Sequence, residues 1–195
     1  MAIWRTSTPL GVTAEHCYGA KMASKIEIKA ATPDAFSDSD RARFRDLVIM
    51  GGEVGGAILE ENIANARVLV TLWADGVMRG VVALKRPRDS YRKKVAGWTG
   101  VALPKPEVPY ELGYVFIESD LQGVGWSHRL IAEALAHTDG AAIFSTVRTD
   151  NARMRATLGK AGFAAAGKPY VRGLNREIGL LTRPRALPSV DAEGR

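Results

Sequence analysis

The chain has 195 residues, of which 46% are hydrophobic and 25% are charged, and it carries a formal net charge of +6 at pH 7. This length fits one domain, and a composition near the globular average excludes collagen-like, fibrous and wholly disordered proteins. Cys17 is the single cysteine, which excludes an internal disulfide, and no Cys/His cluster has the spacing of a structural zinc site.

Membrane insertion is not expected either, because no apolar run approaches the ~20 residues that cross a bilayer. A single cysteine favours a reducing compartment, so we expect a cytoplasmic protein. Because no Cys/His cluster is present, we do not expect a metal. The net charge alone is compatible with an anionic substrate, an anionic cofactor, nucleic acid or simple solubility.

The chain begins with residues 1–24, which show no period of 2 or 3.6 and are expected to form a loose N-terminal extension. Met22 lies just before the first strand-like run and is a candidate for the biological start. Residues 26–30 alternate apolar and polar side chains, which indicates a half-buried strand. Pro33 and Asp34 then open a helical segment that runs to Val48.

A glycine-rich run, 51–56, separates this helix from a second, short helix over 57–66. The run is either a plain interhelical loop or a mobile gate for an acceptor substrate. Residues 67–73 and 77–84 flank Ala74-Asp75-Gly76, and an Asp-Gly pair between two β-rich runs is a strong hairpin signal.

A basic segment, 85–94, is followed by a loop over 101–109, which contains three prolines. Residues 112–117 are apolar on both faces, which is typical of a central strand. A polar loop, 118–125, leads from this strand to a helix over 126–137, which has its apolar residues at helical spacing.

Residues 141–147 predict another buried strand, and Asp150-Asn151 supplies an N-cap for a helix that ends at Ala161-Gly162. The runs 163–171 and 176–181 predict two final strands. The order of elements indicates an α/β (α+β) single domain over 25–183, and a flexible C-terminal tail over 184–195.

The most informative segment is the loop that opens the helix at 126. Its glycines allow the backbone to approach a ligand closely, and its N–H groups with the helix dipole favour a phosphate or pyrophosphate. A strand-to-helix turn without a ligand would have the same glycines. Two other phosphate loops are excluded, since His128 stands where a Rossmann loop needs glycine and no Gly-Lys-Ser/Thr is present.

This segment resembles the acyl-CoA loop of the GCN5-related N-acetyltransferase (GNAT) superfamily, Gln/Arg-x-x-Gly-x-Gly/Ala. Gln122 and Gly125 match it, and Ser127 replaces the usual small residue. The family's helix-opening Asn and its Gly-Phe follow as Asn151 and Gly162-Phe163. The resemblance covers most of the chain and implies a central mixed, mostly antiparallel sheet that is splayed at the acyl-CoA cleft and flanked by about four helices.

The resemblance also implies an acetyl-CoA site. The pantetheine arm is expected beside Val115, Phe116 and Ile117, and Asn151 is counted among the cofactor-binding residues. The pyrophosphate is expected on the loop formed by Gln122, Gly123, Val124, Gly125, Trp126 and Ser127.

Catalysis by direct transfer to an amine needs a base, because a lysine-type amine has a pKa of ~10.4. Glu111 stands at the separation from the loop that the family's general-base glutamate has. Backbone N–H groups near Phe116 and Ile117 are candidate oxyanion donors if the strand bulges there. Leu158 occupies the position of the family's proton-donating tyrosine, so the donor is Ser127, Tyr114 or water, or the chain binds acyl-CoA without turnover.

The sequence therefore predicts an N-acetyltransferase that acts on a primary amine of a small molecule, a peptide N-terminus or a lysine. A non-catalytic acyl-CoA sensor and an RNA-directed acyltransferase are the alternatives. The basic segment alone supports the latter, and without a nucleic-acid motif we do not expect nucleic acid as a partner. Trp98 is a candidate for the acceptor pocket, and a homodimer is compatible with the sequence.

Overall fold

A computed structural model describes residues 25–52, 58–173 and 175–186 of the chain. Its centre is a seven-stranded sheet in the order β1-β2-β3-β4-β5-β7-β6. The strands are β1 (Ile26–Ala31), β2 (Val68–Ala74), β3 (Val77–Lys85), β4 (Tyr110–Ile117), β5 (Ile143–Arg148), β6 (Ala164–Arg172) and β7 (Arg176–Arg183). The helices are α1 (Asp38–Met50), α2 (Ile58–Ala64), α3 (Asp89–Thr99), α4 (Trp126–Ala136) and α5 (Ala152–Lys160).

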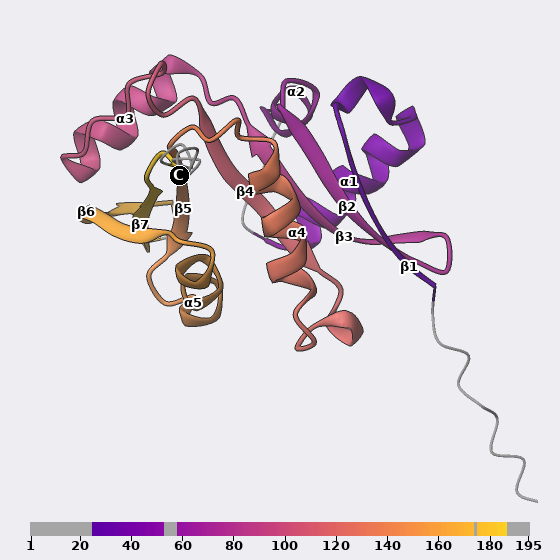
Figure 1. Ribbon diagram of the computed structural model, residues 1–195. Coiled ribbons are helices and arrows are strands. Elements are labelled where there is room, and N and C mark those ends of the chain that lie inside the picture. Colours follow the sequence, from indigo (N-terminus) through magenta and orange to yellow (C-terminus); the bar gives the residue numbers. More distant parts are fainter. Residues whose placement is uncertain (1–24, 53–57, 174, 187–195) are drawn as a thin grey trace, which may run out of the picture.

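Helices lie on both faces of the sheet (Figure 1). Alternate residues of β2 and β3 point to opposite faces, as strand geometry requires. Val70, Leu72 and Val82 pack in one apolar cluster with residues of α4, whereas Leu69 and Val81 pack in another with residues of α1 and α2. In β1, Ile26, Ile28 and Ala30 are partly buried and pack against the first of these clusters, so the half-buried alternation expected for residues 26–30 is confirmed.

The predicted hairpin between β2 and β3 is present and turns at Asp75 and Gly76. Both residues have positive φ, 51° and 80°, which is the conformation that a type I′ turn needs. This turn type matches the twist of the flanking strands, so the Asp-Gly pair fixes the register of the hairpin.

Among the described strands, β4 and β5 form the single parallel pair, and they diverge soon after they meet. Their pairing is confined to Tyr110 with Ile143 and Glu111 with Phe144. Tyr114 has a φ of 57°, and the register of β4 against β3 shifts there, so β4 carries a β-bulge. The sheet is mixed, mostly antiparallel and splayed between β4 and β5, as predicted.

The structure differs from the sequence prediction in the basic segment. Residues 89–94 form the first part of α3, a helix additional to the four that the sequence predicted. Val95 is buried on α3 and packs against Phe144 and Leu180. Gly100 ends the helix in the left-handed conformation, with a φ of 76°. Charged side chains dominate this segment, so the helical spacing of its apolar residues is hard to recognise in the sequence. The expected extension 1–24, most of the expected tail 184–195 and residues 53–56 of the glycine-rich run lie outside the described residues.

Candidate functional site

The divergence of β4 and β5 opens a cleft of about 1040 Å³. Its lining brings together site residues predicted from separate parts of the sequence: Glu111, Val115, Phe116, Ile117, Gln122, Ser127 and Asn151. The loop residues between Gln122 and Ser127, which are Gly123, Val124, Gly125 and Trp126, do not line this cleft. Of these, Gly123, Val124 and Gly125 are exposed to solvent.

The loop before α4 has the backbone geometry of an anion site. Gly123 and Gly125 have φ values of 87° and 91°, which L side chains rarely adopt. Within the described residues, no protein acceptor is assigned to the N–H groups from Gly123 to Ser127, and the first bonded amide of the helix is that of His128. These groups therefore remain available to a phosphate at the positive end of the helix dipole.

Gln122 holds this loop against two neighbouring elements. Its Nε2 donates to the carbonyl oxygen of Ile117 over 2.6 Å, and its Oε1 accepts from Arg153 over 3.1 Å. Both ends of the side-chain amide are thus engaged by protein. Through these contacts Gln122 connects the end of β4 to α5. Arg153, which the sequence interpretation missed, also lines the cleft.

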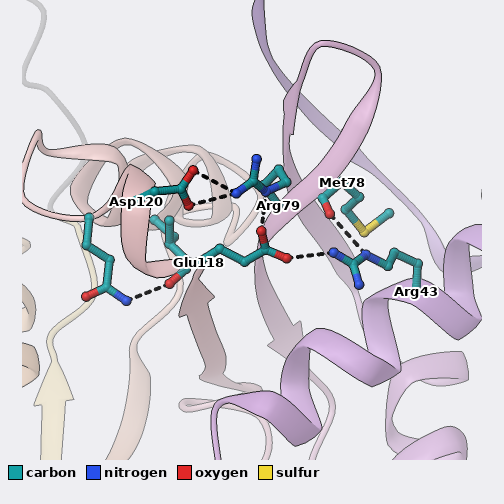
Figure 2. Close-up of polar contacts among 7 residues, drawn as sticks. Arg43, Met78, Arg79, Glu118 and Asp120 are labelled. Atoms are coloured by element: carbon teal, nitrogen blue, oxygen red, sulfur yellow. Dashed lines mark hydrogen bonds and ion pairs between the residues drawn. The ribbon is translucent and has the colours of Figure 1, made fainter. Parts of the chain in front are cut away.

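A network of ion pairs fixes the segment that precedes the loop (Figure 2). Arg43 of α1 donates to Glu118 over 2.7 Å, and Arg79 of β3 bonds the other oxygen of the same carboxylate. Arg79 also binds both carboxylate oxygens of Asp120, at 2.7 and 2.8 Å. Glu118 and Asp120 raise the pKa of Arg79 because they stabilise its charged form. The network ties the end of β4 to α1 and β3.

Asn151 caps α5, as the sequence predicted. Its Oδ1 accepts a hydrogen bond from the backbone N–H of Met154 over 3.0 Å. Asn151 lines the cleft as well, but its oxygen already has a structural partner. Its amide nitrogen is the part of the side chain that a ligand could use.

Glu111 is the most enclosed charged group in the cleft, with 2% of its surface exposed. Its Oε2 lies 2.9 Å from Nζ of Lys85. Its Oε1 accepts from Thr146 over 3.0 Å and from the hydroxyl of Tyr91 over 3.3 Å. None of these partners was identified from the sequence, because each comes from a different element and local spacing carries no sign of the contact.

The tyrosines around Glu111 are held in their neutral form. Burial, followed by the charge of Glu111, raises the pKa of Tyr91 and also raises the pKa of Tyr170 to about 12. Burial raises the pKa of Tyr114, and Lys85 opposes that effect from 4.7 Å above the ring. A phenol near Glu111 can therefore donate a hydrogen bond across the neutral pH range.

Leu158 lies on α5 and lines the cleft, with 1% of its surface exposed. It packs in the larger apolar cluster with residues of α4 and β5. This position therefore contributes packing and no proton. Hydroxyl groups in the cleft come instead from Ser127, Thr146 and Tyr91, among others.

The basic segment proves to be largely occupied by contacts within the protein. Lys85 pairs with Glu111, Arg86 donates to the carbonyl of Ala66 over 3.0 Å, and Arg88 pairs with Glu61. Arg92 is 3% exposed and donates to carbonyls before β4. Four of the six basic residues of the segment are therefore engaged within the protein, and Arg92 is a structural residue.

The described part of the chain has neither a metal-binding group of side chains nor a membrane-spanning helix. No group of three or more His, Cys, Asp and Glu side chains is placed to hold a metal ion there. No helix in that part is long and apolar enough to span a bilayer.

The chain is similar to known proteins in its structure but not in its sequence. No family model and no curated protein matches the sequence. The structure is nevertheless similar to an acyl-CoA N-acyltransferase from Pseudomonas aeruginosa, with a TM-score of 0.60 and 14% identity over 82% of this chain and 99% of that one. It is also similar to an acetyltransferase of the GNAT family from Streptococcus pneumoniae, with a TM-score of 0.58 and 14% identity over 83% and 100% of the two chains.

A third similar structure is Naa50 from Arabidopsis thaliana in complex with the bisubstrate analogue CoA-Ac-MVNAL. Its TM-score is 0.57 at 12% identity, over 80% of this chain and 97% of that one. At these identities the likeness concerns the fold. The chain has the fold of the GNAT superfamily.

Proposed function

We propose that the chain is an N-acetyltransferase that moves the acetyl group of acetyl-CoA directly to a primary amine. The observation that carries the proposal is the gap between β4 and β5, which opens after Glu111 and Phe144 and leads to the free N–H groups of the loop before α4. A buried carboxylate thus lies within the cleft, and an anion site lies beside it, between the lining residues Gln122 and Ser127.

The residues present fit the chemistry of acetyl-CoA. A pantetheine arm is a chain of amides, and the diverging edges of β4 and β5 offer backbone groups to such a chain, as an added strand would use them. The loop from Gly123 to Ser127 suits the pyrophosphate, and Arg153 adds a cation beside Gln122. Acetyl-CoA supplies an acetyl group that is activated as a thioester.

The reaction forms a bond between the amine nitrogen and the acetyl carbon and breaks the bond between that carbon and sulfur. The amine loses one proton, and we assign its acceptance to Glu111, directly or through one water. A carboxylate has about four lone-pair sites, and Lys85, Tyr91 and Thr146 engage three of them. Glu111 therefore keeps capacity for the proton while its partners hold it in place.

The thiolate that leaves needs a proton, and Leu158 cannot provide one. We assign this role to water or to Ser127, which lines the cleft at the end of the loop. A thiol has a pKa of ~8.5, so a thiolate leaves without full protonation. A missing general acid costs on the order of 10²–10⁴ in rate, and activity at a reduced rate is expected.

The decisive experiment measures acetyl-CoA binding by calorimetry and CoA release with a panel of amines. We expect binding and turnover with at least one acceptor, and a kcat for Glu111→Gln that is lower by about 10²-fold, with little change in acetyl-CoA affinity. Glu107→Gln is the matched control, since Glu107 is exposed in the loop before β4. Absence of acetyl-CoA binding by the intact chain would refute the proposal.

A second candidate function is binding of acyl-CoA without turnover. The observation that favours it is Leu158, a buried apolar residue where a proton donor is expected from the family resemblance. Tight binding of acetyl-CoA with no CoA release for any amine, and no difference between the parent and Glu111→Gln, would favour this sensor function over the enzyme.

A further inference from the structure

The cleft continues beyond Glu111 into a half that is walled by α3 and by the β6–β7 hairpin. Trp98 of α3 and Tyr170 of β6 stack there, with ring centroids 4.9 Å apart and an interplanar angle of 27°. Tyr91 adds a third aromatic ring. These rings form an apolar wall on which the body of a substrate could pack.

Cations also gather in this half of the cleft. The lining includes Arg88, Lys94, Arg172 and Arg176, whereas Glu111 is its one acidic residue among the described residues. Arg88 pairs with Glu61, and Arg176 donates to the carbonyl of Gly52 over 3.3 Å. Lys94 and Arg172 have no acidic partner within the described part of the chain.

Arg172 lies close to the proposed reacting centre. Its guanidinium carbon is 5.9 Å from the centroid of the Tyr91 ring, and the hydroxyl of Tyr91 is 3.3 Å from Oε1 of Glu111. About one tyrosine side chain therefore separates a cation from the carboxylate assigned as base. Lys85 already neutralises much of the charge of Glu111, so the field in this half is positive overall.

We propose that the acceptor is an amine that also carries an oxyanion group, a carboxylate or a phosphate, a short distance from its nitrogen. Arg172 and Lys94 bind the anion, and the wall of Tyr91, Trp98 and Tyr170 contacts the apolar body. The amine then faces Glu111. A guanidinium suits this role because its planar fork matches the geometry of carboxylate and phosphate oxygens. The inference rests on the proposed acetyltransferase function and names its substrate class.

The test uses acceptor pairs that differ only in the anionic group. Phenylalanine is compared with phenethylamine, and ethanolamine phosphate with ethanolamine, so that the two pairs distinguish a carboxylate from a phosphate. We expect kcat/KM to be higher by about 10-fold or more for the anionic member of at least one pair, since hydrogen bonds to charged groups are the stronger ones.

Variants then assign the preference to residues. Arg172→Gln and Lys94→Gln should each reduce kcat/KM for the anionic acceptor by roughly 10-fold more than for the neutral acceptor. Lys168→Gln on the same strand and Lys93→Gln on the same helix are the matched controls, because both residues are exposed and outside the cleft lining. Equal rates for both members of both pairs would overturn the inference and leave the acetyltransferase function standing.

A second readout does not depend on turnover. N-acetylphenylalanine and N-acetylphenethylamine are titrated into the protein with CoA present, and ethanolamine phosphate and ethanolamine are titrated in the same way. We expect the anionic member of a pair to bind more tightly than the neutral one. This difference in affinity should be lost in Arg172→Gln. If no amine is acetylated, the acetyltransferase function fails. In that case, equal affinities for the anionic and the neutral ligands would overturn the inference as well. A preference for the anionic ligands that is lost in Arg172→Gln would still support the anion site.

Discussion

Lys85 and Glu111 face one another across β3 and β4, and their side chains form an ion pair of 2.9 Å inside the cleft. They are direct partners in the strand register, so both side chains lie on the same face of the sheet. The side chains are 15% and 3% exposed, and the pair is therefore largely shielded from water. This contact gives Glu111 a fixed position and removes Lys85 from the cations available to a ligand.

Breaking this pair from one side should destabilise the protein. Lys85→Met leaves the Glu111 carboxylate buried without its counter-charge, and we expect a loss of about 3 kcal/mol in the free energy of unfolding. The double variant Lys85→Met with Glu111→Met should recover part of that loss, since no unpaired charge remains. Urea unfolding of the parent, the single variants and the double variant measures the coupling, and strictly additive losses would contradict the importance of the pair.

The left-handed conformation of Gly125 predicts a weaker cofactor site when a side chain is added. An alanine at a φ of 91° costs about 1–2 kcal/mol in backbone strain, although no atom lies within 4 Å of the added Cβ. Gly125→Ala should therefore weaken acetyl-CoA binding by roughly 10-fold in calorimetry. Gly159→Ala in α5 is the control, since it also has open space but no positive φ. An unchanged affinity in Gly125→Ala would separate the loop from the cofactor.

Arg92 is expected to stabilise the fold and not to bind a ligand. It donates to the carbonyls of Pro87, Val108 and Pro109 and so holds α3 against the loop before β4. Arg92→Met leaves these acceptors without donors, and we expect a loss of about 3 kcal/mol in the free energy of unfolding. The exposed neighbour Lys93→Met should change it by less than about 0.5 kcal/mol. Similar effects of both variants in urea unfolding would refute this distinction.

Tyr170 predicts a loss of stability at alkaline pH. Burial raises its pKa from 10.0 to about 12 in the folded state, so the folded protein holds this proton more tightly than the unfolded chain. The resulting stabilisation is fully present below pH 10 and is lost as the pH rises through 12. A shift of two pKa units corresponds to a stabilisation of about 3 kcal/mol at most.

Tyr170→Phe keeps a ring against Trp98 and removes the titrating group. The variant should therefore lose less stability than the parent between pH 10 and 12, in urea unfolding at several pH values. Identical pH profiles for the parent and the variant would show that this phenol does not titrate as its burial predicts.

Much of the fold and of the cofactor half of the site could be predicted because their signals are local. The Asp75-Gly76 turn, the left-handed glycines 123 and 125 and the Asn151 cap each depend on a few consecutive residues. Backbone geometry dictates which residue types these positions accept. The motif spacing from Gln122 to Phe163 then indicated the fold, which the structural comparisons support in the absence of any sequence match.

The sequence by itself thus determined the strand and helix pattern apart from α3, the phosphate-type loop and the position of Glu111 at the head of a central strand. Only the tertiary structure decided which side chains surround that carboxylate, that the basic segment is mostly engaged by protein, and that α3 meets β6 beside Arg172. These contacts join elements from distant parts of the chain. Strand register, the bulge at Tyr114 and the divergence of β4 and β5 set them, and none of these leaves a signal in local spacing.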